Sequence, residues 1–431
     1  MRGIKKLIFT GLTIIFVFSC VELIGFAVLK LRDHDKGIDS SSIHRLSKYR
    51  LFELNPNYRG RKFQKGYKPH SSDGFRRNSS ISVNKPKNVI RIFYMGGSQL
   101  YGAEAALESG YSLHRGLLNS EGIDKVSEDL LNEKLKNSKY PFKVEVINAG
   151  VINYHSFQHL FYIMEKIYRY SPDFIVHLDG ANDFYNINPA YNHLLDYHGV
   201  FDAKLVDYLN ERDFLFATYI MVRSLSPFSY FFSAMERFIL KSLIYGWIET
   251  LFKTIDNDNM LWKPEKFKQQ TSTIDNLKPH YTIYAHNTFI RAYRLIQKLG
   301  DHYGFKTLVF HQPQITFENT DNLGKEDIDI HEKTIKLYKS YKKVGADGVY
   351  NMEVRAAIRE MLPSLFQQYG ILFHDISEIA SPNKIKTQLY VDYTHLTPEG
   401  AHRVGTKMAI QLFPHILFKL KNDDRNSGED K

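Results

Sequence analysis

The stretch RIFYMGGSQLYG, residues 91–102, joins an apolar run to two glycines and a serine. The β-branched and aromatic residues of 89–94 indicate a buried parallel strand, and Gly96 and Gly97 indicate a tight turn where this strand ends. Ser98 therefore falls at the carboxyl end of a strand, which is the edge of an open α/β sheet where ligands bind. Two roles are open to its hydroxyl group: a chemical one, and the capping of the helix that follows.

Three familiar motifs that place glycines near a strand end do not fit this stretch. A phosphate-binding P-loop needs a lysine after its last glycine, but Ala103 follows Gly102. The dinucleotide motif GxGxxG is missing, and Leu100 stands where the GxSxG motif of α/β-hydrolases has its second glycine. The serine therefore belongs to a different α/β fold.

Strand-like and helix-like segments alternate along the rest of the chain. Helical periods, in which apolar residues return every three to four positions, separate short apolar runs that end in glycine, proline or polar residues. The further apolar runs are residues 143–150, 173–180, 306–313 and 371–377, and two of the helical periods are residues 284–303 and 354–369. This alternation predicts an α/β fold in three layers, with a parallel sheet of about five strands between two layers of helices.

Residues 184–278 are too many for an ordinary connection, and they are rich in aromatic side chains. We expect a helical insertion whose rings pack into its own core or onto the sheet. The alternative is a lid over an acyl chain or a second membrane-contacting surface.

Residues 7–29 form an apolar stretch that follows a basic N-terminus and is long enough to cross a bilayer as a helix. We expect residues 1–36 to be an uncleaved, single-pass membrane anchor. A cleaved signal peptide and a lipoprotein processing site at Cys20 are the alternatives. Basic residues flank both ends of the stretch, so the positive-inside rule does not choose an orientation. An extracytoplasmic domain, periplasmic or at the cell surface, is our preference.

The composition is that of a globular protein of 431 residues, 43% of them hydrophobic, with a formal net charge of +10. The basic residues are scattered rather than gathered in one strip, so we expect no nucleic-acid partner and favour a lipid surface or a polysaccharide. Cys20 is the only cysteine, which excludes a disulfide within the chain and a cysteine-ligated metal site.

The composition also changes along the chain. Polar, turn-rich residues 37–88 predict a stalk that approaches the domain, and the charged C-terminus predicts a disordered tail at 421–431. The domain itself then spans residues 89–420, including the insertion.

Side chains suited to assist a serine occur at two other places. Asn182 follows the apolar run 173–180, and its amide group can donate a hydrogen bond to a developing oxyanion, although asparagine after glycine is also an ordinary turn residue. Asp392 and His395 lie just before a helix that Thr397 would cap. Their spacing lets the carboxylate fix the tautomer of an imidazole that activates a serine. The alternative for this pair is a capped turn with a surface histidine.

Four blocks, MGGSQLYG, INAGVINYHSFQ, LDGAND and YVDYTHLTPEG, follow one another at successive strand ends. In their order and context they resemble the blocks of the SGNH hydrolases, also called the GDSL esterase superfamily, over residues 73–414 apart from the insertion. The resemblance implies a flavodoxin-like sheet, with Ser98 as the nucleophile and Asn182 in the oxyanion hole. It also implies that Asp392 and His395 activate the serine.

The chain departs from the family pattern at two positions. Gly97 stands where the family motif has aspartate, and Asn153 stands where the family has a glycine whose N–H group helps to form the oxyanion hole. Asparagine tolerates a left-handed backbone better than other non-glycine residues, so the N–H group of Asn153 can still point correctly. Gly150 is the alternative donor.

The resemblance implies a serine esterase that forms an acyl-enzyme and needs no metal or organic cofactor. An ester-bearing cell-envelope glycan or lipid is the expected substrate. An O-acyltransferase that uses the same residues, and a non-catalytic envelope scaffold with the same fold, remain as alternatives. We expect Asp179 and Asp183 to be turn and cap groups rather than a pair of glycosidase carboxylates.

Overall fold

The computed structural model describes residues 13, 17, 19–23, 43–47, 50–56, 58, 69–103, 117–185, 289–343, 352–381 and 387–428. Most of the expected anchor at 7–29 and nearly all of the expected insertion at 184–278 lie outside these residues. Within the described part of the chain, no helix combines the length and the apolar character that a membrane span requires. The chain divides into two compact units, Met1–Ser42 with Val200–Gln269, and Ile43–Gly199 with Gln270–Lys431. All the elements described below belong to the second unit.

The centre of this unit is a parallel sheet of five strands in the order β4-β3-β5-β6-β7. The first of these strands along the chain lies between the second and the third, which is the flavodoxin-like order and confirms the expected sheet. Ligands bind in such sheets where the order reverses, and here that point lies between β3 and β5. The strands are β3 (Val89–Gly96), β4 (Lys143–Asn148), β5 (Phe174–Asp179), β6 (Lys306–His311) and β7 (Leu372–Asp375).

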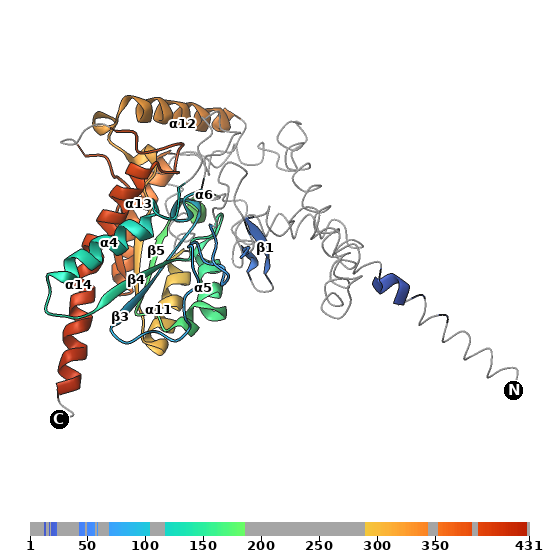
Figure 1. Ribbon diagram of the computed structural model, residues 1–431. Helices are drawn as coiled ribbons and strands as arrows, with labels where there is room; N and C mark the ends of the chain where they lie inside the picture. The colour runs from blue at the N-terminus through green and yellow to red at the C-terminus, as the bar shows by residue number, and fades with distance from the viewer. Residues whose placement is uncertain are drawn as a thin grey trace, which may run out of the picture. The chain divides into compact units, whose positions relative to one another are not determined.

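Helices cover both faces of the sheet, as the alternation of segments predicts (Figure 1). On one face, α4 (Ile123–Lys136) packs beside α14 (Pro398–Gly428), and on the other, α5 (Ser156–Glu165) packs beside α11 (Arg291–Tyr303). The remaining helices are α3 (Ser98–Tyr101), α6 (Ala181–Tyr185), α12 (Lys325–Lys343) and α13 (Met352–Gln368), the last of which contacts β7.

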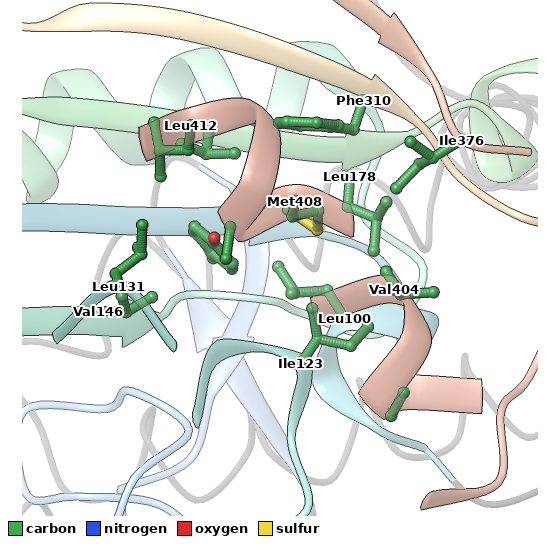
Figure 2. Packing of buried hydrophobic residues seen from close by; sticks show 14 of the residues in the cluster. Leu100, Ile123, Leu131, Val146, Leu178, Phe310, Ile376, Val404, Met408 and Leu412 are labelled. Carbon is green, nitrogen blue, oxygen red and sulfur yellow. The ribbon is translucent and has the colours of Figure 1, made fainter. Parts of the chain in front are cut away.

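The packing of α14 onto the sheet fixes the position of the loop that precedes it. Val404, Met408 and Leu412 recur every four residues along one side of α14, and all three are fully buried. Figure 2 shows them with Leu178 of β5 and Phe310 of β6 in the apolar core between helix and sheet. Because α14 is held in this way, its first residues and the loop before them have a defined place at the edge of the sheet.

Part of the range that we expected to be a stalk, residues 37–88, packs against the domain. The ring of Phe75 lies 5.5 Å from that of Phe93 on β3 and 5.4 Å from that of Tyr170. Earlier in the same range, β1 (His44–Ser47) and β2 (Leu51–Leu54) form an antiparallel hairpin.

The C-terminus differs from the disordered tail that we expected at 421–431, because α14 continues to Gly428. Two aspartates in this range form ion pairs. Lys419 pairs with Asp423 one turn later at 3.2 Å, and Lys139 pairs with Asp424 at 3.4 Å.

Candidate active site

Ser98 lies at the carboxyl end of β3, which ends at Gly96. The short helix α3 begins at Ser98 itself, and Gly97 occupies its N-cap position. Ser98 is therefore one residue past the place where a side chain caps a helix, so the capping role is not the one that its hydroxyl group performs here. Its side chain is half-buried at the edge of the sheet.

The loop before α14 holds Asp392 and His395 in a tight arrangement. Oδ1 of Asp392 accepts hydrogen bonds from the backbone N–H groups of Thr394 (2.9 Å) and His395 (2.7 Å). Its Oδ2 lies 2.7 Å from Nδ1 of His395. Thr397 caps the helix as predicted, because its Oγ1 accepts the N–H group of Gly400 at 3.1 Å. The carboxylate therefore orients both the backbone and the ring of the histidine.

The other ring nitrogen of His395, Nε2, is buried without a hydrogen-bond partner in the part of the chain that the structure describes. Burial opposes ionisation of Asp392, but attraction to His395 and the hydrogen bonds from His395 and Thr394 outweigh it and lower the pKa of the carboxyl. An ionised Asp392 keeps the proton of the neutral ring on Nδ1, and Nε2 can then accept a proton from a nucleophile.

Gln99 connects two segments: the turn that carries Ser98, here called the serine turn, and the loop before α14 that carries Asp392 and His395, here called the histidine loop. The sequence analysis did not find this role. Its Nε2 donates to the backbone carbonyl of Thr394, the residue before His395, and to that of Pro313 at 2.8 Å. Gln312 supports the same loop, because its Nε2 donates to Oγ1 of Thr394 at 3.1 Å. The residue after Ser98 is thus bonded to the residue before His395, which brings both segments to one edge of the sheet.

Asn182 lies beside the serine turn, as the resemblance implies. Its Nδ2 donates to the backbone carbonyl of Tyr154 at 2.9 Å, and this bond uses one of the two hydrogens on the amide nitrogen. A methyl group added to Gly97 would come within 2.4 Å of the same Nδ2. The glycine at position 97 therefore leaves room for the Asn182 amide against the backbone that carries Ser98.

Asn153 has a left-handed backbone with φ of 65°, a conformation that asparagine tolerates better than other non-glycine residues. Two hydrogen bonds hold the turn, from Val151 N to Gly96 O (2.9 Å) and from Tyr154 N to Val151 O (3.1 Å). Gly150 does not fit the alternative role that we gave it. Its N–H group donates to Oδ1 of Asn148 at 2.9 Å and is therefore already used within the protein.

A buried polar cluster lies behind this edge of the sheet. Nδ1 of His159 and Nδ1 of His177 lie 3.0 and 3.6 Å from Oδ2 of Asp179, and the hydroxyl group of Tyr293 donates to the same oxygen at 2.5 Å. Within the described residues, His159, His177 and Asp179 are the group that could hold a metal ion, since their ligand atoms lie within 4.8 Å of one another.

The charges of this cluster can balance without an ion. Burial opposes the charged form of His159, but attraction to Asp179 outweighs it and raises the pKa of the imidazole. Burial lowers the pKa of His177 to about 4, so this ring is neutral at pH 7. Asp179 is therefore a buried partner of His159, whose charged form it favours, rather than the turn or cap group that we expected, a difference that depends on contacts between distant segments.

Asp183 is a cap group, as we expected, and the helix that it caps is α5. Its Oδ1 accepts the backbone N–H group of Ser156 at 3.0 Å and the hydroxyl group of Ser156 at 2.6 Å, at the first residue of α5. Burial raises the pKa of Asp183. The bonds tie the segment after β5 to the start of α5.

The fold and this site define a class of protein: a doubly wound α/β domain that carries a serine, a histidine–aspartate pair and an asparagine amide along the carboxyl edge of its sheet. No family model and no curated protein matches the sequence. Among solved structures, the acetyl xylan esterase AlAXEase is similar at 13% identity and a TM-score of 0.30, over 74% of this chain and 98% of that chain.

Two further solved structures are similar at the same level. A protein designated a GDSL-like lipase, from Parabacteroides merdae, has 9% identity and a TM-score of 0.32 over 78% of this chain and 99% of that chain. A variant of the acetyl xylan esterase Axe2 from Geobacillus stearothermophilus has 10% identity and a TM-score of 0.30 over 73% of this chain and 90% of that chain. At these values the matches do not decide the function, and the assignment below rests on the geometry of the site.

Proposed function

We propose that this protein is a serine ester hydrolase of the SGNH type. The observation that carries the proposal is the state of His395: its Nδ1 is bound to Asp392 at 2.7 Å, while its Nε2 has no partner among the described residues. Through Gln99 this histidine loop is bonded to the turn that carries Ser98. An imidazole that is oriented on one side and unpartnered on the other, on a loop bonded to the turn that carries a serine, is suited to general-base catalysis.

The reaction proceeds in two halves. In the first, Nε2 of His395 takes the proton of the Ser98 hydroxyl group while Oγ attacks the ester carbonyl carbon. The tetrahedral intermediate then breaks its bond to the alcohol oxygen, which receives the proton from Nε2 as it leaves, and an acyl-enzyme remains. In the second half, water attacks the acyl group and gives its proton to His395, which returns it to Ser98 as the carboxylic acid leaves. Asp392 stays ionised throughout and stabilises the imidazolium.

The oxyanion that forms in each half needs hydrogen-bond donors. We assign this role to the remaining N–H of the Asn182 amide and to the backbone N–H groups of Ser98 and Asn153. Each such donor is worth about 3 kcal/mol of barrier in enzymes of this kind. A left-handed Asn153 and the close approach of Asn182 to Gly97 support the assignment.

The proposed substrate is an O-acylated glycan or a lipid of the cell envelope. The net charge of +10 suits an anionic glycan or membrane surface, and its scattered distribution argues against nucleic acid. The apolar residues 7–29 support a single-pass anchor. In this proposal the catalytic domain lies on the extracytoplasmic side of the membrane, where a cell-envelope substrate is found.

The proposal is tested with the full-length protein purified in detergent. Wild type is expected to release p-nitrophenol from p-nitrophenyl acetate and butyrate, and Ser98→Ala is expected to lose this activity. The control is Ser364→Ala, which removes an exposed hydroxyl group on α13 that bonds only locally to Met361 O, and it should retain full activity. Equal rates for wild type and Ser98→Ala would remove the proposal.

A further inference from the structure

Arg50 is a buried arginine in the turn between β1 and β2, with 2% of its surface exposed. Its Nε bonds Glu165 at 2.6 Å, its Nη1 donates to the hydroxyl group of Tyr154 at 3.1 Å, and its Nη2 pairs with Glu53. The guanidinium also lies 4.0 Å from the ring centroid of Tyr162. A charge buried this deeply must be paired, so these contacts hold the hairpin firmly against α5 and the turn before it.

The backbone of the hairpin also holds the side chain of Tyr154. The hydroxyl group of Tyr154, which is fully buried, donates to the carbonyl of Phe52 at 2.5 Å, and the two rings meet edge to face at 5.3 Å. Gln158 Nε2 donates to the carbonyl of Arg50 at 3.3 Å. The side chain of Tyr154 is thus fixed at its far end by residues that lie about 100 positions earlier in the chain.

The backbone of the same tyrosine touches both of the proposed oxyanion donors outside the serine turn. Its carbonyl oxygen accepts Nδ2 of Asn182 at 2.9 Å, and the residue before it is the left-handed Asn153. A non-glycine residue in the left-handed region persists only where the surrounding structure holds it there. The bonds from Tyr154 to Arg50 and Phe52 supply such a constraint, because Tyr154 is the residue next to Asn153.

We propose that Arg50 is a positioning residue for the oxyanion hole: it fixes Tyr154, and through Tyr154 it sets the N–H group of Asn153 and the amide of Asn182. This inference rests on the proposed function and deepens it. It makes the hairpin of β1 and β2, which precedes the sheet in the chain, part of the active site. Arg50 touches no reacting atom, so its effect passes entirely through the tyrosine.

A purely structural role for Arg50 would look different, and Arg91 provides the matched comparison. Arg91 is 1% exposed and bonds Glu145 at 2.8 Å and the carbonyls of Ser82 and Tyr170 at 2.9 and 3.0 Å. It lies near the amino end of β3, away from the catalytic edge. Its loss should lower the melting temperature without changing the rate of the folded enzyme.

The experiment compares Arg50→Met, Tyr154→Phe and Arg91→Met in the full-length protein. For p-nitrophenyl acetate, we expect kcat of the first two variants to fall about tenfold while KM changes less than twofold, because misplaced oxyanion donors weaken only the transition state. Phenylboronic acid, which forms a tetrahedral adduct with a serine, should bind them about tenfold more weakly. Arg50→Lys should recover part of the rate, and Arg91→Met should keep kcat.

Each result bears on the inference. An unchanged kcat in folded Arg50→Met, or an equal fall in Arg91→Met, would overturn it. If Arg50→Met does not fold, Tyr154→Phe decides, because it removes the hydroxyl group that joins Tyr154 to Arg50 and to the carbonyl of Phe52, and an unchanged kcat there overturns the inference as well. These outcomes differ from failure of the proposed function, in which wild type would show no activity above that of Ser98→Ala.

Discussion

Nδ2 of Asn182 and the backbone carbonyl of Tyr154 are joined by a hydrogen bond of 2.9 Å. The bond connects the segment after β5 to the turn after β4, two strands that lie on opposite sides of β3 in the sheet. Since Ser98 follows β3, the amide and the tyrosine turn follow the strands on either side of the strand that leads to the serine. The consequences of this arrangement can be tested at the residues that make it possible.

Gly97→Ala is expected to damage catalysis while leaving the fold intact. Gly97 has φ of −84°, outside the left-handed region that favours glycine, so the neighbours of the added methyl group decide the effect. The added methyl group would lie 2.4 Å from Nδ2 of Asn182 and must displace the amide. Loss of one oxyanion donor should lower kcat about 100-fold. Steady-state kinetics with p-nitrophenyl acetate checks the rate, and circular dichroism checks the fold.

The control for this variant is Gly304→Ala at the end of α11. Gly304 has φ of 82° and no neighbouring atom within 4 Å of an added methyl group. Alanine there should cost about 1 kcal/mol of stability through backbone strain and leave kcat unchanged. Full activity in Gly97→Ala would show that the Asn182 amide does not serve the reaction.

Asp392→Asn is expected to lower kcat by about 10⁴. Asparagine can keep the bonds from the backbone N–H groups of Thr394 and His395, but its NH₂ group would face Nδ1 of His395 and favour the tautomer that carries the proton on Nε2. That tautomer cannot accept the serine proton. The comparison is Asp129→Asn, an exposed partner of Lys125, which should leave kcat unchanged. A variant at position 392 with near-normal kcat would contradict the assigned role.

Gln99→Leu should lower both stability and rate. It removes the donor that the buried carbonyls of Pro313 and Thr394 share, and each unsatisfied buried group costs about 1–3 kcal/mol. The histidine loop then loses its bond to the serine turn, so kcat should also fall. Gln297→Leu, which breaks an exposed bond to Gly370, is the control and should change neither quantity appreciably. Urea denaturation and kinetics measured together separate the two effects, and a stability loss with unchanged kcat would count against the link.

Because of Lys166, we expect the free energy of unfolding to rise at alkaline pH. Burial lowers the pKa of this lysine from 10.5 to about 8, with Arg50 as a second unfavourable charge. Between these values the unfolded chain binds more protons than the folded one, so the free energy of unfolding rises as pH goes from about 8 to 10.5. The full difference amounts to about 3 kcal/mol.

The measurement for Lys166 is urea denaturation at pH 7.5 and pH 10 for wild type and Lys166→Met. The ammonium group donates to the carbonyl of Asp73 and lies 4.1 Å from the ring centroid of Phe75, so methionine can pack against the same ring. Other groups titrate in both proteins and cancel in the comparison. Identical pH dependence in the two proteins would exclude Lys166 as the cause.

Much of the architecture and of the site could be predicted from local sequence. The strand before Ser98 and the strand before Asn182 are short apolar runs that end in glycine, and both occur where they were expected. Thr397 caps α14 as predicted, which places Asp392 and His395 in the loop before it. These predictions succeed because strand periodicity, turn residues and helix caps depend on residues a few positions apart.

Only the tertiary structure decided which hydrogen bonds join these segments to one another. The bond from Gln99 to Thr394 spans 295 residues, and the bond from Arg50 to Tyr154 spans 104 residues. The use of the Gly150 N–H group by Asn148 and the pairing of Asp179 with His159 also follow from how the chain packs. The sequence by itself determined which chemical groups stand at the sheet edge, because local patterns encode strand ends. It did not determine their partners, because helix-to-sheet packing brings distant segments together and no local pattern records it.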